Sequence, residues 1–193
     1  MLADTRIQTR HICISGFLQS IAKPVGFERL WLKLRKHESP QVRVSYLPWD
    51  SDWSAVAEHL MRTGPEDDFT SLKIRVYAYS WGVGNGFVKL AKELRHRGMT
   101  IDKAVLCDGV YHSGWFPWRA VFSPFWTPRI VVPDNVGEVW WLRQREDKPM
   151  GHDVRADDCA STTIHDAKVL SVGHSYMDDS PEFHRTCLKV ARS

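Results

Sequence analysis

The sequence contains no apolar stretch long enough to cross a membrane as a helix, which needs about 20 consecutive apolar residues. Its first ten residues are polar and charged and lack the apolar segment of a secretory signal, so we expect a cytoplasmic protein. No long run of lysine and arginine occurs and the net charge is +3, which argues against a nucleic-acid partner. The 193 residues are 43% hydrophobic and 25% charged, which predicts one globular domain with a sizeable core.

Motifs that bind metals or nucleotides are also missing. Four cysteines are scattered through the chain: Cys13, Cys107, Cys159 and Cys187. They form no C-x-x-C pair, which argues against a zinc ribbon or a redox pair, so we expect buried free thiols. The His152-Asp153 and Asp157-Asp158 pairs lack metal-ligand spacing, and Gly82-Val83-Gly84-Asn85-Gly86 fits no nucleotide-binding pattern. We therefore expect neither a metal nor a cofactor.

Short apolar segments alternate with amphipathic segments along the chain. The expected strands are rich in β-branched residues and cover residues 11–15, 42–47, 72–78, 103–107, 138–144 and 167–172. The expected helices carry apolar residues at helical spacing and cover residues 27–37, 52–62, 81–98 and 181–192. This alternation predicts an α/β fold, a three-layer α/β/α sandwich around a mostly parallel sheet.

Several residues indicate where helices begin and which way side chains face. Asp52 and Ser180 are expected N-caps, and Pro181 suits the first position of the last helix. Asp178 and Asp179 precede that helix, and we expect them to complement its dipole. The adjacent Trp140 and Trp141 lie in a strand, so one should face each helix layer.

Ser80 lies at the joint of an apolar strand and a helix, in the run Tyr77-Ala78-Tyr79-Ser80-Trp81-Gly82. A serine on such a tight turn projects its hydroxyl from the end of the sheet, beside the first N–H groups of the helix. The small residues at 78 and 82 suit a turn that brings backbone close to backbone. The alternative is a serine that caps an ordinary helix.

This run resembles the nucleophile elbow G-x-S-x-G of the α/β-hydrolase family, with Ala78 in place of the first glycine. The resemblance covers about Ile12 to Val190 and implies a minimal α/β-hydrolase fold without the family's first strands. Within the family, the chain is similar to small esterases and lipases. The resemblance implies a serine hydrolase that cleaves an apolar, small-molecule carboxylic ester through an acyl-enzyme. An acyltransferase, a thioesterase or an inactive binding protein of the same fold remain alternatives.

A serine nucleophile needs a histidine base and an orienting carboxylate, which follow in the order Ser, acid, His in this family. His174 fits the base because it follows the last expected strand and precedes the last helix. His165 precedes that strand, and we expect His184, within the last helix, to be exposed to solvent. The histidine assigned by the resemblance is therefore His174.

Asp108 is the preferred acid because it directly follows an apolar strand, on the edge of the sheet where sites form. Gly109 allows a sharp exit there. Asp147 and then Asp153 are the alternatives, since most family members carry the acid after the next strand. A carboxylate that only caps the following turn is the other interpretation of Asp108.

The resemblance also implies two N–H donors that stabilise an oxyanion, those of Trp81 and Phe17. Phe17 follows the run Ile14-Ser15-Gly16, where Gly16 could equally be a simple strand exit. The mechanism implied is proton transfer from Ser80 to His174, attack on the acyl carbonyl, and hydrolysis of the acyl-enzyme.

An aromatic segment at about residues 109–135 shows no regular pattern and leaves the catalytic end of the expected sheet. We expect a single domain over residues 1–193 with this segment as a cap-like insertion. Its candidate substrate-pocket residues are Trp115, Phe116, Trp118 and Phe122. A local aromatic core without a ligand role is equally consistent with the pattern. The sequence does not indicate an oligomeric state.

Overall fold

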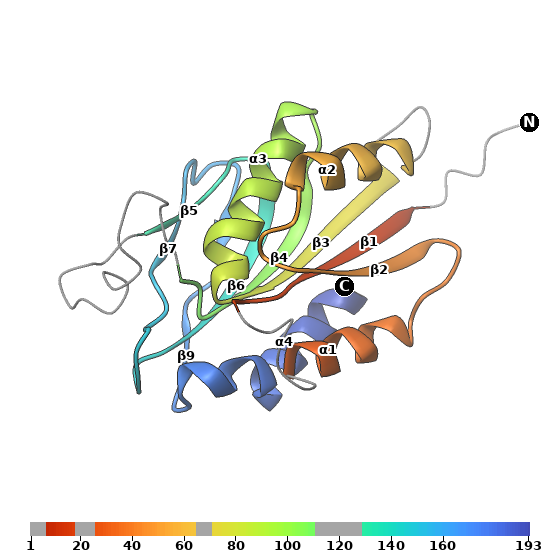
Figure 1. The fold of residues 1–193 in the computed structure, drawn as a ribbon. Helices are drawn as coiled ribbons and strands as arrows, with labels where there is room; N and C mark the ends of the chain where they lie inside the picture. The colour runs from red at the N-terminus through yellow and green to blue at the C-terminus, as the bar shows by residue number, and fades with distance from the viewer. Residues whose placement is uncertain (1–6, 18–25, 65–70, 111–128) are drawn as a thin grey trace, which may run out of the picture.

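The computed structural model describes residues 7–17, 26–64, 71–110 and 129–193, in which a parallel sheet lies between two helix layers (Figure 1). The strands of the main sheet are β1 (Gln8–Ile14), β2 (Val42–Leu47), β3 (Leu72–Tyr79), β4 (Ile101–Cys107), β6 (Val136–Gln144), β8 (Thr163–Ile164) and β9 (Lys168–Leu170). The helices are α1 (Gly26–Arg35), α2 (Trp53–Arg62), α3 (Val88–His96) and α4 (Pro181–Arg192). A second sheet contains β5 (Ile130–Val132) and β7 (Val154–Ala156).

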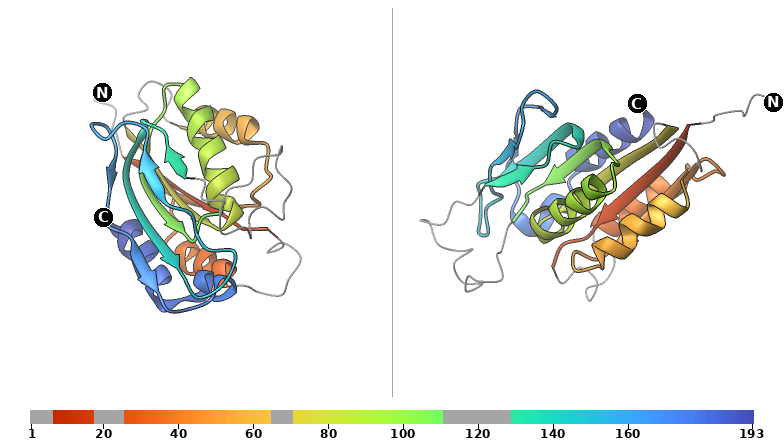
Figure 2. Two further views of the ribbon diagram at one scale, coloured as in Figure 1. Left: turned by 90° about the vertical axis from the view of Figure 1, so that its left-hand side faces the viewer. Right: turned by 90° about the horizontal axis from the view of Figure 1, so that it is seen from above.

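The main sheet runs in the order β2-β1-β3-β4-β6-β8, and β9 also pairs with β6. Every described strand pair is parallel. Helices α2 and α3 cover one face and α1 and α4 cover the other, as Figures 1 and 2 show. The predicted α/β/α sandwich is therefore confirmed. All strand carboxyl ends of the main sheet lie at one edge, which is where the candidate site residues follow β1, β3, β4, β6 and β9.

The side chains of β3 alternate between two separate cores, one on each face of the sheet. Ile74, Val76 and Ala78 pack under α2 and α3, whereas Tyr77 and Tyr79 pack toward α1 and α4. None of the five is more than 4% exposed. Burying a large apolar side chain contributes about 1.5–3 kcal/mol. The strand is therefore held from both faces, and this fixes the position of the residue that follows it.

Two predicted helix caps are confirmed. The Oδ1 of Asp52 accepts the N–H of Ala55 at 3.0 Å, and the Oγ of Ser180 accepts the N–H of Phe183 at 3.3 Å. The dipole role expected for Asp178 stays a prediction, and the structure adds a second contact, since its buried Oδ2 accepts the N–H of Phe27 at 3.0 Å. Asp178 therefore satisfies the N-terminus of α1, a helix that is distant in sequence.

The structure departs from the expected elements in three respects, and it also differs in the exposure of one cysteine. The helix expected over residues 81–98 begins as a π-helical turn, Gly82–Phe87, before α3. The last strand, β9, is shorter than expected. The sequence did not predict β5, β7 or β8, because two or three residues carry too little periodicity to indicate a strand. Cys159 is exposed, whereas the other three cysteines are buried as expected.

The two adjacent tryptophans face opposite layers as predicted. Trp141 packs against the core under α2 and α3, and Trp140 packs against the other core. Of the insertion expected at about 109–135, residues 111–128 lie outside the described part of the chain. Ile130 and Val132, which follow them, belong to the core under α2 and α3.

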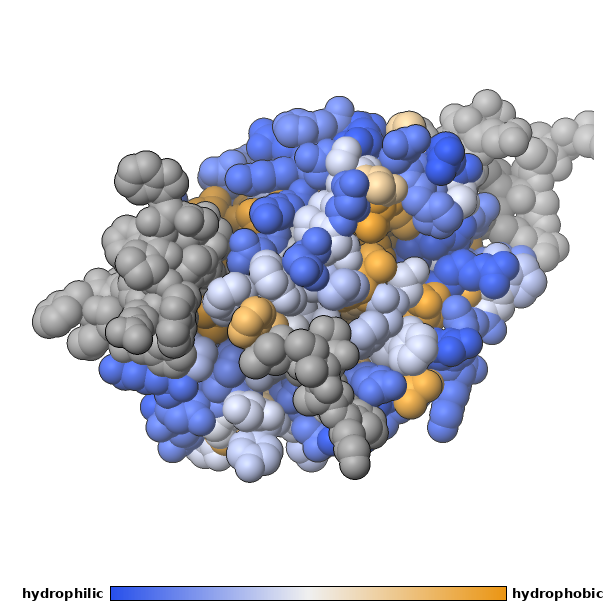
Figure 3. Space-filling model, viewed as in Figure 1, coloured by the Kyte–Doolittle hydropathy of each residue, from blue (hydrophilic) through white to orange (hydrophobic). Residues whose placement is uncertain are grey.

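On the face shown in Figure 3, the described surface is mostly hydrophilic and its apolar residues form small patches. No helix within the described ranges has the length and apolar character needed to cross a membrane.

Candidate active site

Ser80 occupies the turn between β3 and the π-helical turn Gly82–Phe87. Its φ angle is +54°, a left-handed conformation that non-glycine residues rarely adopt without support from the surrounding structure. The Ser80 N–H donates to the carbonyl of Cys107 and the Ser80 carbonyl accepts the N–H of Val83, both at 3.0 Å. These bonds fix Ser80, which is only 4% exposed, at the carboxyl edge of the sheet.

Two glycines let neighbouring backbone approach Ser80. A Cβ on Gly16 would lie 2.9 Å from the Cβ of Ser80, and a Cβ on Gly82 would lie 2.5 Å from the carbonyl oxygen of Ile14. Both separations are too short for a side chain, so the exit of β1 and the turn after β3 both require glycine. Ala78 is completely buried, so a methyl group fits where the α/β-hydrolase pattern has its first glycine.

The hydroxyl of Ser80 does not cap the following helix. Trp81 occupies the position before the π-helical turn, and no side chain caps that described end. The Oγ of Ser80 instead lies 3.0 Å from the Nε2 of His174. The geometry therefore matches a nucleophile with its base rather than a helix cap.

His174 joins the other two candidate residues through its two ring nitrogens. It follows β9 and begins a 3-10 helix, His174–Asp179, that leads to α4. Its Nδ1 lies 2.6 Å from the Oδ2 of Asp108, while its Nε2 faces Ser80. Asp108 follows β4 and has a φ angle of +43°. This chain of bonds can transfer the serine proton to the imidazole and stabilise the imidazolium against a carboxylate.

The carboxylate of Asp108 is completely buried and well supplied with donors. Its Oδ1 accepts the backbone N–H groups of Gln144 and Gly151, both at 3.0 Å. Its Oδ2 accepts from the side-chain amide of Gln144 at 3.2 Å, besides the bond to His174. A buried carboxylate requires such partners, because an unpaired charge away from water is very costly. These donors fix the orientation of Asp108, and it does more than cap a turn.

The alternative acids lie elsewhere around the site. The Oδ1 of Asp147 accepts the backbone N–H of His174 at 2.7 Å, so this carboxylate touches the main chain of the histidine and not its ring. Asp153 forms an ion pair with Arg143. Of the three candidates, only Asp108 is hydrogen-bonded to the imidazole of His174 in the described structure.

Tyr79 contacts both the main chain and the ring of His174. Its hydroxyl donates to the carbonyl of His174 at 2.6 Å, and the two rings stack with centroids 5.3 Å apart. Burial raises the pKa of Tyr79, so its phenol remains protonated and able to donate. The main chain of His174 is therefore held at its carbonyl by Tyr79 and at its N–H by Asp147.

The competing histidines have structural partners. His165 stacks on Trp140 with centroids 4.3 Å apart and bonds to Glu138 at 3.2 Å. The expectation that His184 is solvent-exposed is wrong, because it is 5% exposed and its Nε2 bonds to the carbonyl of Asp178 at 2.8 Å. Neither histidine has a bond to Ser80 among the described contacts.

Three aromatic rings gather beside Ser80. The ring of Phe17 stacks on that of Trp81 with centroids 4.9 Å apart, and Trp49 meets Trp81 edge-on at 5.2 Å. Phe17 is 50% exposed, so this group offers apolar surface to solvent next to Ser80. Phe17 and Trp81 are also the residues whose N–H groups are predicted to stabilise an oxyanion. The expected pocket residues Trp115, Phe116, Trp118 and Phe122 lie outside the described part of the chain.

A cysteine nucleophile and a metal are not supported by the described residues. Burial raises the pKa of Cys107, next to Asp108, so its thiol stays protonated and unreactive. In the described ranges, no three His, Cys, Asp or Glu side chains are grouped closely enough to bind a metal ion.

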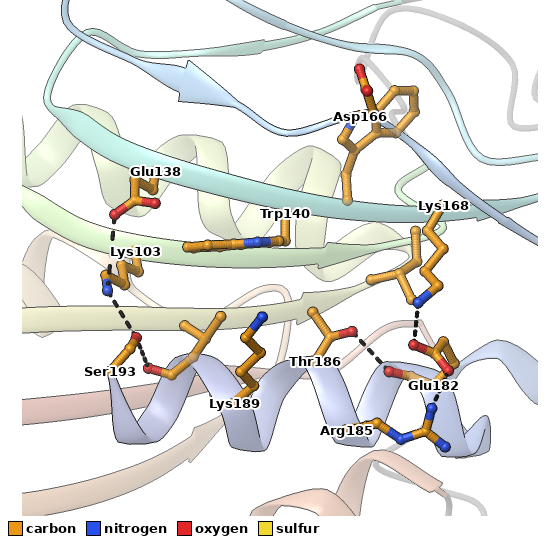
Figure 4. A pocket seen from close by; sticks show the side chains of 13 residues that line it. Lys103, Glu138, Trp140, Asp166, Lys168, Glu182, Arg185, Thr186, Lys189 and Ser193 are labelled. Carbon is orange, nitrogen blue, oxygen red and sulfur yellow. Dashed lines mark hydrogen bonds and ion pairs between the residues drawn. The ribbon is translucent and has the colours of Figure 1, made fainter.

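A separate groove of about 420 Å³ lies between β6 and α4, and no residue of the serine site lines it (Figure 4). Its charged side chains largely neutralise one another. Lys103 lies 3.9 Å from Glu138, Arg185 pairs with Glu182 at 2.7 Å, and Lys168 also pairs with Glu182. The described side chains of this groove do not converge on one point where a substrate atom could react.

Sequence reasoning missed three residues that support the site, namely Tyr79, Gln144 and Gly151. Tyr79 was noted only as part of the run around Ser80, and Gln144 only as the end of a strand. One signal was present for Gln144, because an amide at the end of a strand that is expected to be buried must find hydrogen-bond partners.

The parallel sheet with helices on both faces, and the tight strand–turn–helix joint at its carboxyl edge, match the α/β-hydrolase fold. Solved structures of low sequence identity share it. RedJ, a thioesterase from the prodiginine biosynthetic pathway in Streptomyces coelicolor, is 12% identical with a TM-score of 0.52, over 95% of this chain and 85% of that one. ClbQ, from the colibactin NRPS/PKS pathway, is 10% identical with a TM-score of 0.50, over 96% of both chains.

A third similar structure is YbtT, a type II thioesterase from the yersiniabactin NRPS/PKS biosynthetic pathway. It is 10% identical with a TM-score of 0.50, over 98% of this chain and 93% of that one. No protein-family model and no curated protein matches the sequence. The identities are low, so the similarity establishes the fold and leaves the chemistry to the residues of the site.

Proposed function

We propose that this protein is a serine hydrolase that cleaves an acyl bond through an acyl-enzyme on Ser80. The observation that carries the proposal is the continuous chain of hydrogen bonds from Ser80 through His174 to Asp108, at 3.0 and 2.6 Å. The buried and fully bonded Asp108 supports it further, because a base must be held in one tautomer and one orientation.

The proposed reaction starts with transfer of the Ser80 proton to the Nε2 of His174. The Oγ of Ser80 then attacks the acyl carbonyl, and the N–H groups of Trp81 and Phe17 stabilise the oxyanion that forms. His174, held by Asp108, returns the proton to the leaving group, and water releases the acyl group by the same steps. Every proton transfer uses a group of this chain, and the reaction requires no cofactor.

A thioester is the favoured bond and a carboxylic ester the second candidate. The resemblance of the sequence to esterases and lipases favoured the carboxylic ester, whereas two of the similar structures, RedJ and YbtT, are described as thioesterases. A thiol leaving group has a pKa of about 8.5 and can depart as a thiolate, so a thioester depends less on proton donation by His174 than an ester does.

The acyl group is proposed to be apolar. The rings of Phe17, Trp49 and Trp81 form a cluster next to Ser80, and half of the surface of Phe17 faces solvent. Exposed aromatic rings beside a nucleophile provide a surface that removes an apolar chain from water. A small-molecule acyl compound with an aliphatic or aromatic acyl group suits this surface.

The proposal is tested with matched substrates that differ only in one atom of the scissile bond. The same octanoyl group is offered as a thioester and as an oxygen ester, each with water alone and with an added alcohol or thiol acceptor. We expect hydrolysis of both, with a higher kcat/KM for the thioester, and no hydrolysis of either by Ser80→Ala. Faster transfer to the acceptor than to water would instead identify an acyltransferase. Binding without turnover by the wild-type protein would identify an inactive hydrolase fold.

A further inference from the structure

Gln144, the last residue of β6, is completely buried although glutamine is usually exposed. Its Nε2 lies 3.2 Å from the Oδ2 of Asp108 and 3.0 Å from the carbonyls of both Asp147 and Pro149. Its Oε1 accepts the N–H groups of Glu146 and Asp147, at 2.7 and 2.9 Å. The amide orientation is set by these partners, because a flipped amide would place its oxygen against three acceptors.

These bonds fold the loop of residues 145–151 around one side chain. Two backbone N–H groups and two carbonyls of the loop point inward to the carboxamide of Gln144. In this way a short connection without regular structure acquires a fixed shape, because its buried backbone groups are satisfied by one central amide.

Two residues of this loop contact the acid and the base of the candidate site. Asp147 accepts the backbone N–H of His174 at 2.7 Å. Gly151 donates its N–H to the Oδ1 of Asp108 at 3.0 Å. The approach is so close that a Cβ on Gly151 would lie 2.2 Å from that Oδ1. Likewise, a Cβ on Gly173 would lie 2.4 Å from the Oδ2 of Asp147.

We propose that Gln144 is a positioning residue that aligns the acid and the base of this site. Directly, its amide donates to the Oδ2 of Asp108, the same oxygen that is hydrogen-bonded to the Nδ1 of His174. This second bond holds the carboxylate against rotation. Indirectly, it shapes the loop in which Asp147 and Gly151 restrain His174 and Asp108. This inference rests on the proposed function, since it assigns Gln144 a role within the Ser80 reaction. Small displacements of catalytic groups are costly, and about 1 Å can reduce the rate roughly 100-fold.

The test replaces the amide by groups of similar volume. Gln144→Met removes all of its hydrogen bonds, whereas Gln144→Glu keeps the acceptor for the two loop N–H groups and loses the donor to Asp108. The matched control is Asn135→Leu, because the amide of Asn135 also donates to two backbone carbonyls, those of Ala91 and Met99, at 2.9 and 3.0 Å. Asn135 bonds to no residue of the candidate site among the described contacts.

The readouts are KM, the melting temperature and kcat per active site. The concentration of active sites in each variant is found by titrating a separate sample to completion with a fluorophosphonate. A residue that only stabilises the fold changes the melting temperature and the active fraction, but not the kcat of each intact site. We expect Gln144→Met and Gln144→Glu to lower kcat per titrated site by roughly 10- to 100-fold with little change in KM. We expect Asn135→Leu to lower the melting temperature and leave kcat per site unchanged.

A second pair of variants tests the loop at an exposed position, where a substitution should not prevent the protein from folding. Asp147 is exposed, so Asp147→Ala removes the bond to the N–H of His174 without disturbing the core, and Asp147→Asn keeps an oxygen that can accept it. We expect Asp147→Ala to lower kcat per site by several fold and Asp147→Asn to restore most of it. The inference is overturned if these variants and Gln144→Met turn over as fast per titrated site as the wild type. A folded wild type that the fluorophosphonate does not label would instead contradict the proposed function itself.

Discussion

The Oδ2 of Asp108 accepts a hydrogen bond from the Nδ1 of His174 at 2.6 Å, although the two residues are 66 positions apart in the sequence. Such a short bond between a buried carboxylate and an imidazole fixes the ring and leaves its Nε2 directed at Ser80.

Asp108→Asn should lower kcat by about 10,000-fold, because an amide can donate to the imidazole and favour the wrong tautomer. Asp153→Asn is the matched control, since Asp153 pairs with Arg143 and not with the histidine ring. It should keep kcat within about 2-fold of the wild type. Steady-state kinetics with an octanoyl thioester measures both. Full activity of Asp108→Asn would contradict the assignment of this acid.

Phe17→Ala should separate the ring of this residue from its N–H group. The side chain is removed but the backbone donor proposed for the oxyanion remains. We expect KM for an octanoyl thioester to rise about 10-fold, roughly the loss of 1.4 kcal/mol of apolar contact, with KM for the acetyl thioester nearly unchanged. An equal change for both substrates would show that the aromatic cluster does not bind the acyl chain.

His11 should make the stability of the fold depend on pH. Burial, followed by the charges of Arg75 and His37, lowers the pKa of His11 from 6.5 to about 4. The unfolded chain binds the proton more readily, so stability is complete above pH 6.5 and is lost as the pH falls toward 4. The full effect is roughly 3 kcal/mol, from about 1.4 kcal/mol per pKa unit.

Urea unfolding at several pH values tests this linkage. His11→Asn is the comparison, because the asparagine oxygen can still accept from the hydroxyl of Tyr77, which lies 2.9 Å from the Nδ1 of His11. We expect the variant to show a flatter dependence of the free energy of unfolding between pH 6.5 and 4. The same slope in both proteins would exclude His11 as its origin.

Asp52→Ala should destabilise the protein by about 1 kcal/mol without affecting turnover. The Oδ1 of Asp52 accepts the N–H of Ala55, and the loss leaves one helix N–H of α2 without its cap. Asp50→Ala, at an exposed neighbouring position, should change stability by less than about 0.5 kcal/mol. Urea unfolding of the two variants measures the difference, and equal stabilities would contradict the capping role.

The elements that could be predicted from the sequence are those with strong local signals. The strand β3 and the helix α4 have long apolar patterns, and Asp52 and Ser180 are helix caps that act within three residues. The candidate residues Ser80, Asp108 and His174 were found because each follows a strand, and parallel strands bring their carboxyl ends to one edge.

The features that were missed depend on contacts between segments distant in sequence. Asp178 binds the N-terminus of α1, and His184 is buried against its carbonyl, and neither contact leaves a local pattern. Gln144 is similar, since its partners include Asp108, 36 positions away. The π-helical turn after Ser80 lies within the helix expected over residues 81–98, because apolar residues at helical spacing do not distinguish a π-helical turn from an α-helical one.

Mass spectrometry after fluorophosphonate treatment of the folded protein tests the central claim most directly. The expected result is a single covalent adduct on Ser80, absent from Ser80→Ala and formed far more slowly by Asp108→Asn. A folded wild-type protein that remains unlabelled, or an adduct that persists in Ser80→Ala, would contradict the assignment of Ser80 as the nucleophile.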